Sequence, residues 1–267
     1  MSGRRVVRLI VSILMLVFLS GASCDSDRES STIETSEMTA RFVARANASG
    51  VTKIVAELLV SDGLVQENVN LDGGDRLIAS RIEPGAIDAS DRVMVERVDG
   101  FETEYGANFQ SGERDTVIGI DFDRSASGQL DATGSSVTLP TPFAIRWVSD
   151  PVALTPAPRF FSRSTPTPLY VVWDPSGAPD FEPGDELLYE VTGTCIRRIS
   201  GEIDWAGGED ALELTAALED AAPPNDGRSC PVRVELNLVR SGTISPAFAG
   251  GTFDGAQGRV LKLQTVP

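Results

Sequence analysis

The chain has three cysteines and no histidine, and this combination limits the chemistry that is open to it. The absence of histidine removes Ser-His-Asp and Cys-His catalysis, histidine-ligated zinc or haem, and a histidine pH switch. Carboxylates, hydroxyls, arginines and the backbone remain as binding or reactive groups. We therefore expect a non-enzymatic protein with no catalytic residue, no metal site and no cofactor.

Cys195 and Cys230 have surroundings that are typical of a disulfide. Each cysteine falls on the alternate, apolar positions of its segment, residues 187–195 in one case and 230–238 in the other. Alternate residues of a strand point the same way, so both thiols are expected to face the core. A bridge between them closes a loop of about 36 residues and stabilises by roughly 3 to 4 kcal/mol in the chain-entropy model. A redox or metal role for this pair is disfavoured.

Closely spaced acids are the other candidates for chemistry. They fall into three groups: Asp72 with Asp75, Asp121 with Asp123, and Asp204 with Glu209 and Asp210. Calcium binds six to eight oxygens, but none of the groups matches a complete calcium loop. A glycosidase needs two carboxylates about 5 to 9 Å apart, and the sequence nominates no pair among 39 acids. A solvated acidic surface is the favoured interpretation, with a carboxylate-based hydrolase as the alternative.

The tryptophans and the glycine-rich segments could also form binding features. Trp147, Trp173 and Trp205 could stack on a sugar, yet Trp173 shares its face with two aliphatic residues, which favours core packing. Residues 73–74 and 249–251 are rich in glycine, but neither segment leads into a helix start or a lysine as a phosphate loop does. We expect both segments to be turns.

The charge of the chain argues against nucleic acid as a partner. The sequence has 23 basic and 39 acidic residues, and Lys53 and Lys262 are its only lysines. A phosphate-binding surface needs clustered lysine and arginine, which this sequence lacks. So negative a protein stays soluble and is repelled by anionic headgroups.

The first 24 residues have the order of an export signal. Three arginines precede an apolar run, Leu9 to Leu19, and four small residues then lead to Cys24. The run is far shorter than the roughly 20 residues of a membrane-spanning helix. Small residues before the cysteine resemble the lipobox of bacterial lipoproteins, with Gly21 where leucine is usual. We expect cleavage after residue 23, a lipid on Cys24, and an address in the bacterial cell envelope, on the periplasmic side or at the cell surface. Cleavage removes three arginines and no acid, leaving 20 basic and 39 acidic residues and a formal charge of −19.

The rest of the chain must position these residues. In it, apolar and polar side chains alternate with a dominant period of two residues. Residues 101–109 and 118–122 alternate apolar and polar side chains, which is typical of half-buried antiparallel strands. Five prolines between residues 148 and 168 suggest a junction near Asp150. We predict an all-β protein: a signal peptide (1–23), a lipidated cysteine with a disordered tether (24–37), and two consecutive immunoglobulin-like antiparallel β-sandwich domains (38–149 and 150–267). In the stretch 211–220 we expect a short strand followed by a helical turn.

Several short motifs follow one another along the chain, and their order carries a resemblance to known proteins. The segments concerned are 73–77, 138–143, 161–163, 173–177, 195–196 and 240–251, the last reading Arg-Ser-Gly-Thr and then Pro-Ala-Phe-Ala-Gly-Gly. With them the chain resembles an uncharacterised group of proteobacterial exported proteins and lipoproteins, from about residue 39 onward. This resemblance implies a cellular location and a fold, but it implies no activity.

A sandwich without histidine offers surfaces more readily than a reaction site. We therefore expect a binding or structural module whose partners are the membrane, through the lipid, and envelope proteins or glycans. A carbohydrate-binding or hydrolytic protein is the alternative.

The intact mass of the protein, extracted from its native membrane, tests both cysteine assignments. We expect a mass that shows cleavage before Cys24 plus acyl chains, and a gain of about 2 Da on reduction because one disulfide takes up two protons and two electrons. A mass without acyl chains would contradict the anchor, and an unchanged mass on reduction would contradict the disulfide.

Overall fold

The computed structural model describes residues 27–63, 65–83, 91–98, 104–110, 115–124, 132–158, 160–173, 181–207, 210–216, 218 and 229–267. Cys24 and the expected signal peptide lie outside the described residues. Within the described ranges, no helix combines the length and the apolar character that a membrane crossing requires.

The fold is all-β, as the period-two pattern predicts. The strands are β1 (Arg28–Glu29), β2 (Met38–Ala46), β3 (Thr52–Asp62), β4 (Val65–Asn70), β5 (Arg76–Ile82), β6 (Asp91–Arg97), β7 (Tyr105–Phe109), β8 (Val117–Asp123), β9 (Ala132–Thr138), β10 (Ile145–Asp150), β11 (Thr155–Pro156), β12 (Phe160–Ser162), β13 (Tyr170–Trp173), β14 (Glu186–Gly193), β15 (Ile199–Ile203), β16 (Ala211–Glu213), β17 (Cys230–Ser241) and β18 (Gly250–Val266). Within the described ranges, three short 3-10 helices accompany them: η1 (Ser30–Thr32), η2 (Thr35–Glu37) and η3 (Trp205–Gly207). The stretch after β16 forms the expected helical turn, in which the Leu218 amide donates to the Leu214 carbonyl (2.9 Å).

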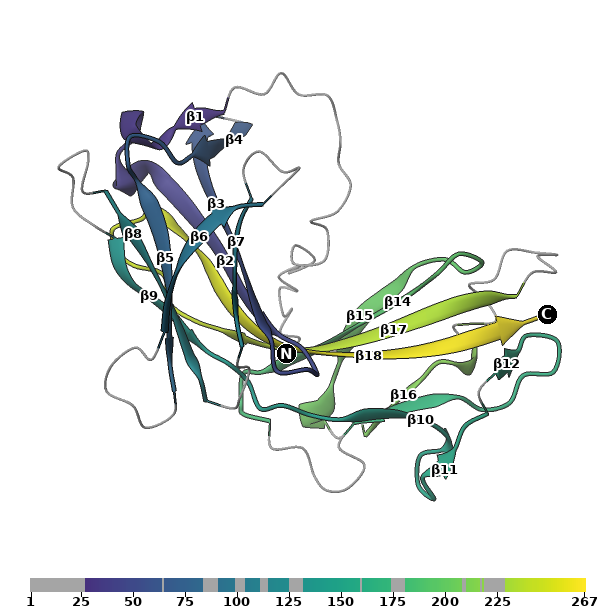
Figure 1. Cartoon of the computed structure of the whole chain (residues 1–267). Coiled ribbons are helices and arrows are strands. Elements are labelled where there is room, and N and C mark those ends of the chain that lie inside the picture. Colours follow the sequence, from purple (N-terminus) through teal and green to yellow (C-terminus); the bar gives the residue numbers. More distant parts are fainter. Residues whose placement is uncertain are drawn as a thin grey trace, which may run out of the picture.

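The described strands form two sheets, which do not divide the chain into two separate sandwiches. A 14-stranded mixed sheet has the order β15-β14-β17-β18-β2-β3-β7-β6-β5-β8-β9, with β1, β4 and β12 beside this path. A 4-stranded sheet has the order β11-β10-β13-β16. The large sheet runs through both lobes of the molecule (Figure 1), so hydrogen bonding makes them one body.

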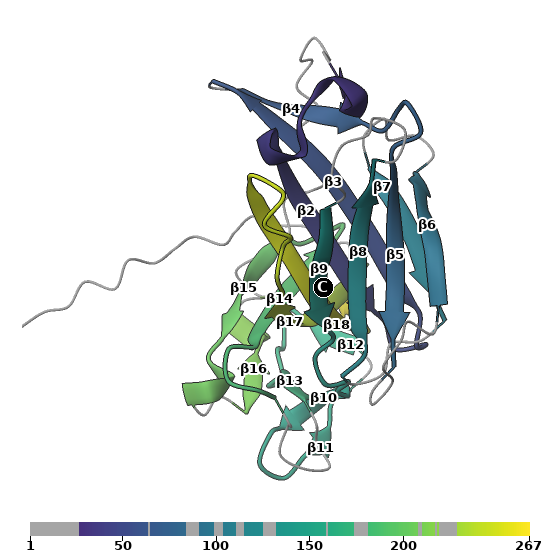
Figure 2. The ribbon, with the colours of Figure 1, turned by 90° about the vertical axis from the view of Figure 1, so that its left-hand side faces the viewer.

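Lobe 1 consists of β1 to β9 and the first half of β18. Its sheet curls so that β5, β8 and β9 lie in front of β2, β3 and β18, with a hydrophobic core between the two layers (Figure 2). The curl is closed by a bridge between Ser136 of β9 and Thr243, which precedes β18. Phe42, Phe122 and Phe248 pack in the centre of this core.

Lobe 2 is a two-layered structure. The strands β15, β14, β17 and the second half of β18 form one layer, and the small sheet forms the other. Trp173, Leu187 and Leu236 belong to the core between them. This core begins at Phe143, ahead of the junction expected near Asp150.

Strand β18 belongs to both lobes. Its first half pairs in parallel with β2, from Gly250↔Thr39 to Gln257↔Ala46, and residues 254–265 pair antiparallel with β17. Phe253 contributes to the first core and Leu263 to the second, so both cores lie on the same side of the sheet. The turn expected at residues 249–251 is wrong, because Gly250 and Gly251 start this strand. A side chain at Gly251 would collide with the backbone of Ala40, so glycine is needed for this close pairing.

The disordered tether expected over residues 24–37 is wrong for its described part, residues 27–37. Strand β1 pairs in parallel with β4, and Ile33 is 1% exposed within the first core. Asp72 accepts hydrogen bonds from Ser30 Oγ (3.0 Å), the Ser31 amide (2.8 Å) and Ser31 Oγ (2.7 Å). The segment is therefore an ordered part of lobe 1.

Arg124 holds this N-terminal segment from inside the protein. Its guanidinium is 0% exposed and donates to the Ser30 carbonyl (2.6 Å), the Ile33 carbonyl (2.7 Å) and Thr35 Oγ1 (3.1 Å). Its charge is balanced by Asp75 Oδ2 at 3.2 Å. A buried cation is stable only when its donors are satisfied, and here two backbone carbonyls and one hydroxyl of the N-terminal segment satisfy them together with Asp75.

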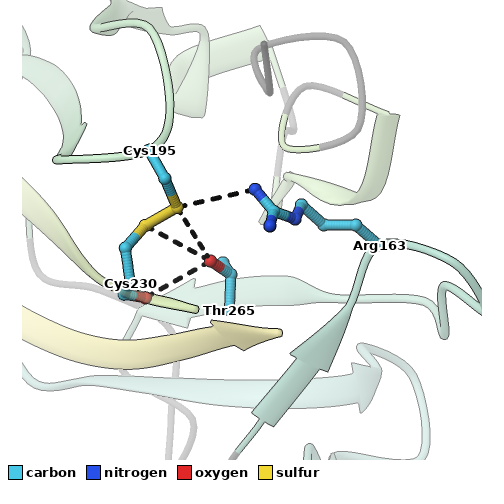
Figure 3. Close-up of a disulfide and its surroundings, with 4 residues drawn as sticks. All are labelled: Arg163, Cys195, Cys230 and Thr265. Carbon is cyan, nitrogen blue, oxygen red and sulfur yellow. Dashed lines mark hydrogen bonds between the residues drawn. A yellow bond between two sulfur atoms is a disulfide. The ribbon is translucent and has the colours of Figure 1, made fainter. Parts of the chain in front are cut away.

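The disulfide between Cys195 and Cys230 is confirmed, with a Cα–Cα distance of 5.8 Å. Cys195 follows the end of β14, and Cys230 starts β17, so the bridge joins neighbouring parts of one layer. Figure 3 shows Thr265 Oγ1 beside both sulfurs, at 3.4 Å from each, and Arg163 approaching Cys195. The bridge ties the turn after β14 to the end of the sheet that is remote from lobe 1.

We expect Arg124→Met to destabilise lobe 1 by roughly 3 to 5 kcal/mol, because it leaves Asp75 buried without its counter-charge. Urea unfolding measures this loss, and limited proteolysis should show cleavage within residues 27–37. The control is Arg76→Met, which removes the exposed pair of Arg76 with Asp123 and should cost about 1 kcal/mol or less. Equal losses in both variants would contradict the role given to Arg124.

Candidate functional site

The two lobes meet at an angle, and the large sheet lines the inside of that angle (Figure 1). We call this surface the inner face: the side of β2, β3, β14, β17 and β18 that is turned away from both cores. Register places these polar side chains on it: Arg45, Lys53, Glu190, Glu235, Asn237 and Lys262. Among the described residues, both lobes contribute side chains to the inner face, which lies on the side of the sheet opposite to the two cores.

Arg45 connects the lobes across this face. It lies on β2 and forms an ion pair with Glu235 and a hydrogen bond with Asn237, both on β17, with β18 between the two strands. The crossing passes over Gly258 of β18, where an added Cβ would lie 3.0 Å from Arg45 Nε and 3.1 Å from Asn237 Oδ1. Glycine therefore leaves the space that the arginine occupies.

Two glutamates on neighbouring strands need arginines as counter-charges. Glu190 and Glu235 lie directly opposite each other on β14 and β17, a placement that is destabilising without counter-charges. Arg198 pairs with Glu190, while Arg45 and Arg233 pair with Glu235. Burial lowers the pKa of Arg45, the charge of Arg233 lowers it further, and Glu190 opposes the shift.

The inner face also contains buried polar side chains. Glu235, Asn237 and Asp254 are 5%, 6% and 5% exposed, although they lie on the side away from the cores. Burial raises the pKa of Asp254, and the hydrogen bond from Ser241 Oγ (3.2 Å) opposes this shift. Burial also raises the pKa of Glu186, with further contributions from the charges of Glu202 and Asp254. The inner face thus combines ion pairs with two carboxyl groups whose pKa is raised by burial.

Five of the acidic residues singled out in the sequence have structural partners. Asp72 binds the serines of η1, and Asp75 binds Arg124. Asp121 lies 3.4 Å from the Gly134 amide, Asp123 pairs with Arg76, and Asp204 accepts from the Gly207 amide (2.8 Å). Glu209 lies outside the described residues. Within the described ranges, no three cysteine, aspartate or glutamate side chains are arranged to hold a metal ion.

The tryptophans pack in lobe 2. Trp173 is buried, and Trp147 and Trp205 pack against the same core. Trp205 meets Phe181 edge to face, with ring centroids 5.3 Å apart, and donates from Nε1 to the Asp185 carbonyl (3.0 Å). The preference for core packing over a sugar platform is confirmed for Trp173.

The sequence reasoning missed the inner face because it treated each strand alone. A signal was present: residues 230–240 place Arg233, Glu235 and Asn237 on one face of a strand whose other face is apolar. The contact of Glu235 and Asn237 with Arg45 depends on the pairing of β18 with β2, and no local sequence pattern predicts this pairing. Comparison with protein-family models gave no match for this chain. Comparison with curated proteins gave no match either.

We expect Asp254→Asn to change stability in a pH-dependent way. A carboxyl with a raised pKa in the folded state stabilises the protein below its unfolded pKa, and this contribution is lost as the pH rises through the folded pKa. The variant lacks this contribution, so its stability relative to wild type should increase from about pH 4 to pH 7. Urea unfolding at several pH values measures the difference.

Asp72→Asn provides the control with the opposite sign. Burial acts to raise the pKa of Asp72, but hydrogen bonds from Ser31 and Ser30 outweigh it and lower the pKa. The stability of this variant relative to wild type should therefore fall as the pH rises toward about 4, the unfolded pKa of an aspartate, and change little above it. Parallel pH profiles for the two variants would contradict the assignment for Asp254.

Proposed function

We propose that this protein is a lipid-anchored, non-enzymatic binding module of the bacterial cell envelope, and that its inner face binds another envelope protein. The observation that carries the proposal is the inner face itself, where charged side chains of both lobes meet on one continuous sheet. Surfaces rich in paired charges of both signs fit a polar protein partner through complementary potentials. The partner contacts both lobes, because each contributes exposed charges on either side of the bend.

The proposed compartment is supported by the disulfide. Disulfides persist in oxidising compartments, which in bacteria lie outside the cytoplasm. The pair Cys195 and Cys230 leaves Cys24 as the third cysteine, which agrees with acylation of that residue. The resemblance to exported proteobacterial lipoproteins supports the same address.

The binding role is supported by what the acidic side chains do. The candidate pairs considered for metal or hydrolytic chemistry bind arginines, serines and backbone amides, and these bonds stabilise the fold. One observation favours the alternative of a carbohydrate-binding or hydrolytic protein: Glu186 and Asp254 lie on the same face and both have a raised pKa. Glycosidases use such a carboxyl as a general acid.

The distribution of lysine offers a direct test. Lys53 and Lys262 are the only lysines of the chain, and both are exposed on the inner face, one in each lobe. An amine-reactive crosslinker applied to native membranes should therefore join this protein to its partner from the inner face. We expect one product of defined mass, which is lost in the variant K53R/K262R because arginine keeps the charge and lacks the amine.

The same lysines separate the two candidate functions. A product that persists in K53R/K262R, or no product at all, would contradict the protein-binding role of the inner face. Acetylation of Lys53 and Lys262 in the purified protein tests the alternative, since envelope glycan fragments bound at this face would slow the reaction. Unchanged acetylation rates in the presence of the fragments would remove the carbohydrate alternative.

A further inference from the structure

The ordered N-terminal segment determines how an anchored protein would stand on its membrane. A disordered tether over residues 25–37 would reach about 45 Å and leave the protein free to turn. In the structure the chain is already part of lobe 1 at Asp27, where Asp27 Oδ2 accepts from Asn70 Nδ2 (3.0 Å). Three residue steps separate Cys24 from Asp27, a span of about 10 Å at most.

Buried contacts attach this segment to lobe 1. Three acceptors from the segment satisfy the buried guanidinium of Arg124, and Ile33 fills part of the first core. Undocking would leave the buried guanidinium without three of its acceptors and expose an apolar side chain, and both changes are costly. The lipid would therefore hold a fixed corner of lobe 1.

That corner consists of β1, β4 and the turn that contains Asp72. The parallel pairing of β1 with β4 points the chain before Arg28 toward the start of β4, where Val65 is 62% exposed. Lobe 2 lies at the opposite end of lobe 1, and its strand β11 is far from β4 in both views (Figures 1 and 2).

We propose that the end of lobe 1 formed by β1, β4 and the turn 72–75 lies against the lipid headgroups, and that lobe 2 is held away from the bilayer. The proposal rests on the lipid at Cys24 that the proposed function includes. A protein this acidic is repelled by anionic headgroups, so the covalent lipid and its short connection hold the surface in place. The contact should consequently persist at high salt.

Two exposed valines give a matched pair of probes. Val65 lies at the proposed membrane-facing end, and Val152, 93% exposed, follows β10 in lobe 2. V65C and V152C each introduce one free thiol, because Cys24 is acylated and the other two cysteines are bridged. Each lipidated protein is labelled with a fluorophore and placed in phosphatidylcholine vesicles that contain a headgroup spin-labelled lipid.

We expect the probe at position 65 to lose most of its fluorescence at low and high salt, and the probe at position 152 to keep it. Inserting a Gly/Ser linker of about 20 residues between Asp25 and Ser26, with an r.m.s. span of about 25 Å, should restore the fluorescence at position 65. Equal quenching at both positions, or quenching that the linker leaves unchanged, would overturn the proposal.

The intact mass of each labelled protein distinguishes a failure of the proposed anchor from a failure of the proposed orientation. Acyl chains on Cys24 with no difference between the probes would overturn the orientation and leave the anchor standing. A mass without acyl chains would overturn the anchor, and the orientation with it.

Discussion

The structure depends on the pairing of one long strand, β18, with β2 on one side and β17 on the other. A strand of 17 residues is about 55 Å long, enough to pass beneath two cores. Phe253 and Leu263 are an even number of positions apart in the sequence, so one strand supplies apolar side chains to both cores from the same face. Without this strand the lobes would be two separate units joined by a connection.

The close contacts around β18 explain its composition. At Gly251 the backbone of β2 approaches too closely for a side chain, and at Gly255 the side chain of Val137 from β9 occupies the space. At Gly258 the inner face is crossed by Arg45. Glycine in a strand weakens it through lost packing and greater chain entropy, so these positions give up local stability for contacts with both lobes.

Much of the local structure could be predicted from the sequence, because it depends on short-range patterns. Alternation predicted the strands β7 and β8, and the shared face of Cys195 and Cys230 with aliphatic residues predicted the disulfide. Contacts that depend on chain topology could not be predicted. Residues 27–37 have one large apolar residue, Ile33, and composition alone indicates disorder; the cation that orders them is 91 positions away from Ile33. The parallel pairing of β18 with β2 likewise joins opposite ends of the chain.

The prediction of two immunoglobulin-like sandwiches also depended on chain topology, which local patterns do not determine. Alternating strands indicate sheets with one buried face, but they do not say which sheet each strand joins. An antibody domain places its disulfide between two facing sheets, whereas here Cys195 and Cys230 join parts of one layer. Strand pattern and cysteine spacing are therefore compatible with a sheet that continues from one lobe into the next.

This continuity matters for the proposed function. From Asp27 the segment is fixed to lobe 1 by Arg124, lobe 1 is fixed to β18 by β2, and β18 is fixed to lobe 2 by β17. The ion pair of Arg45 with Glu235 adds a side-chain contact across the bend. Each step is a hydrogen-bonded strand pair or a buried ionic contact, with no flexible linker between them. A partner on the inner face would therefore be held at a defined position relative to Asp27 and so close to the proposed anchor, which a protein on a loose tether could not achieve.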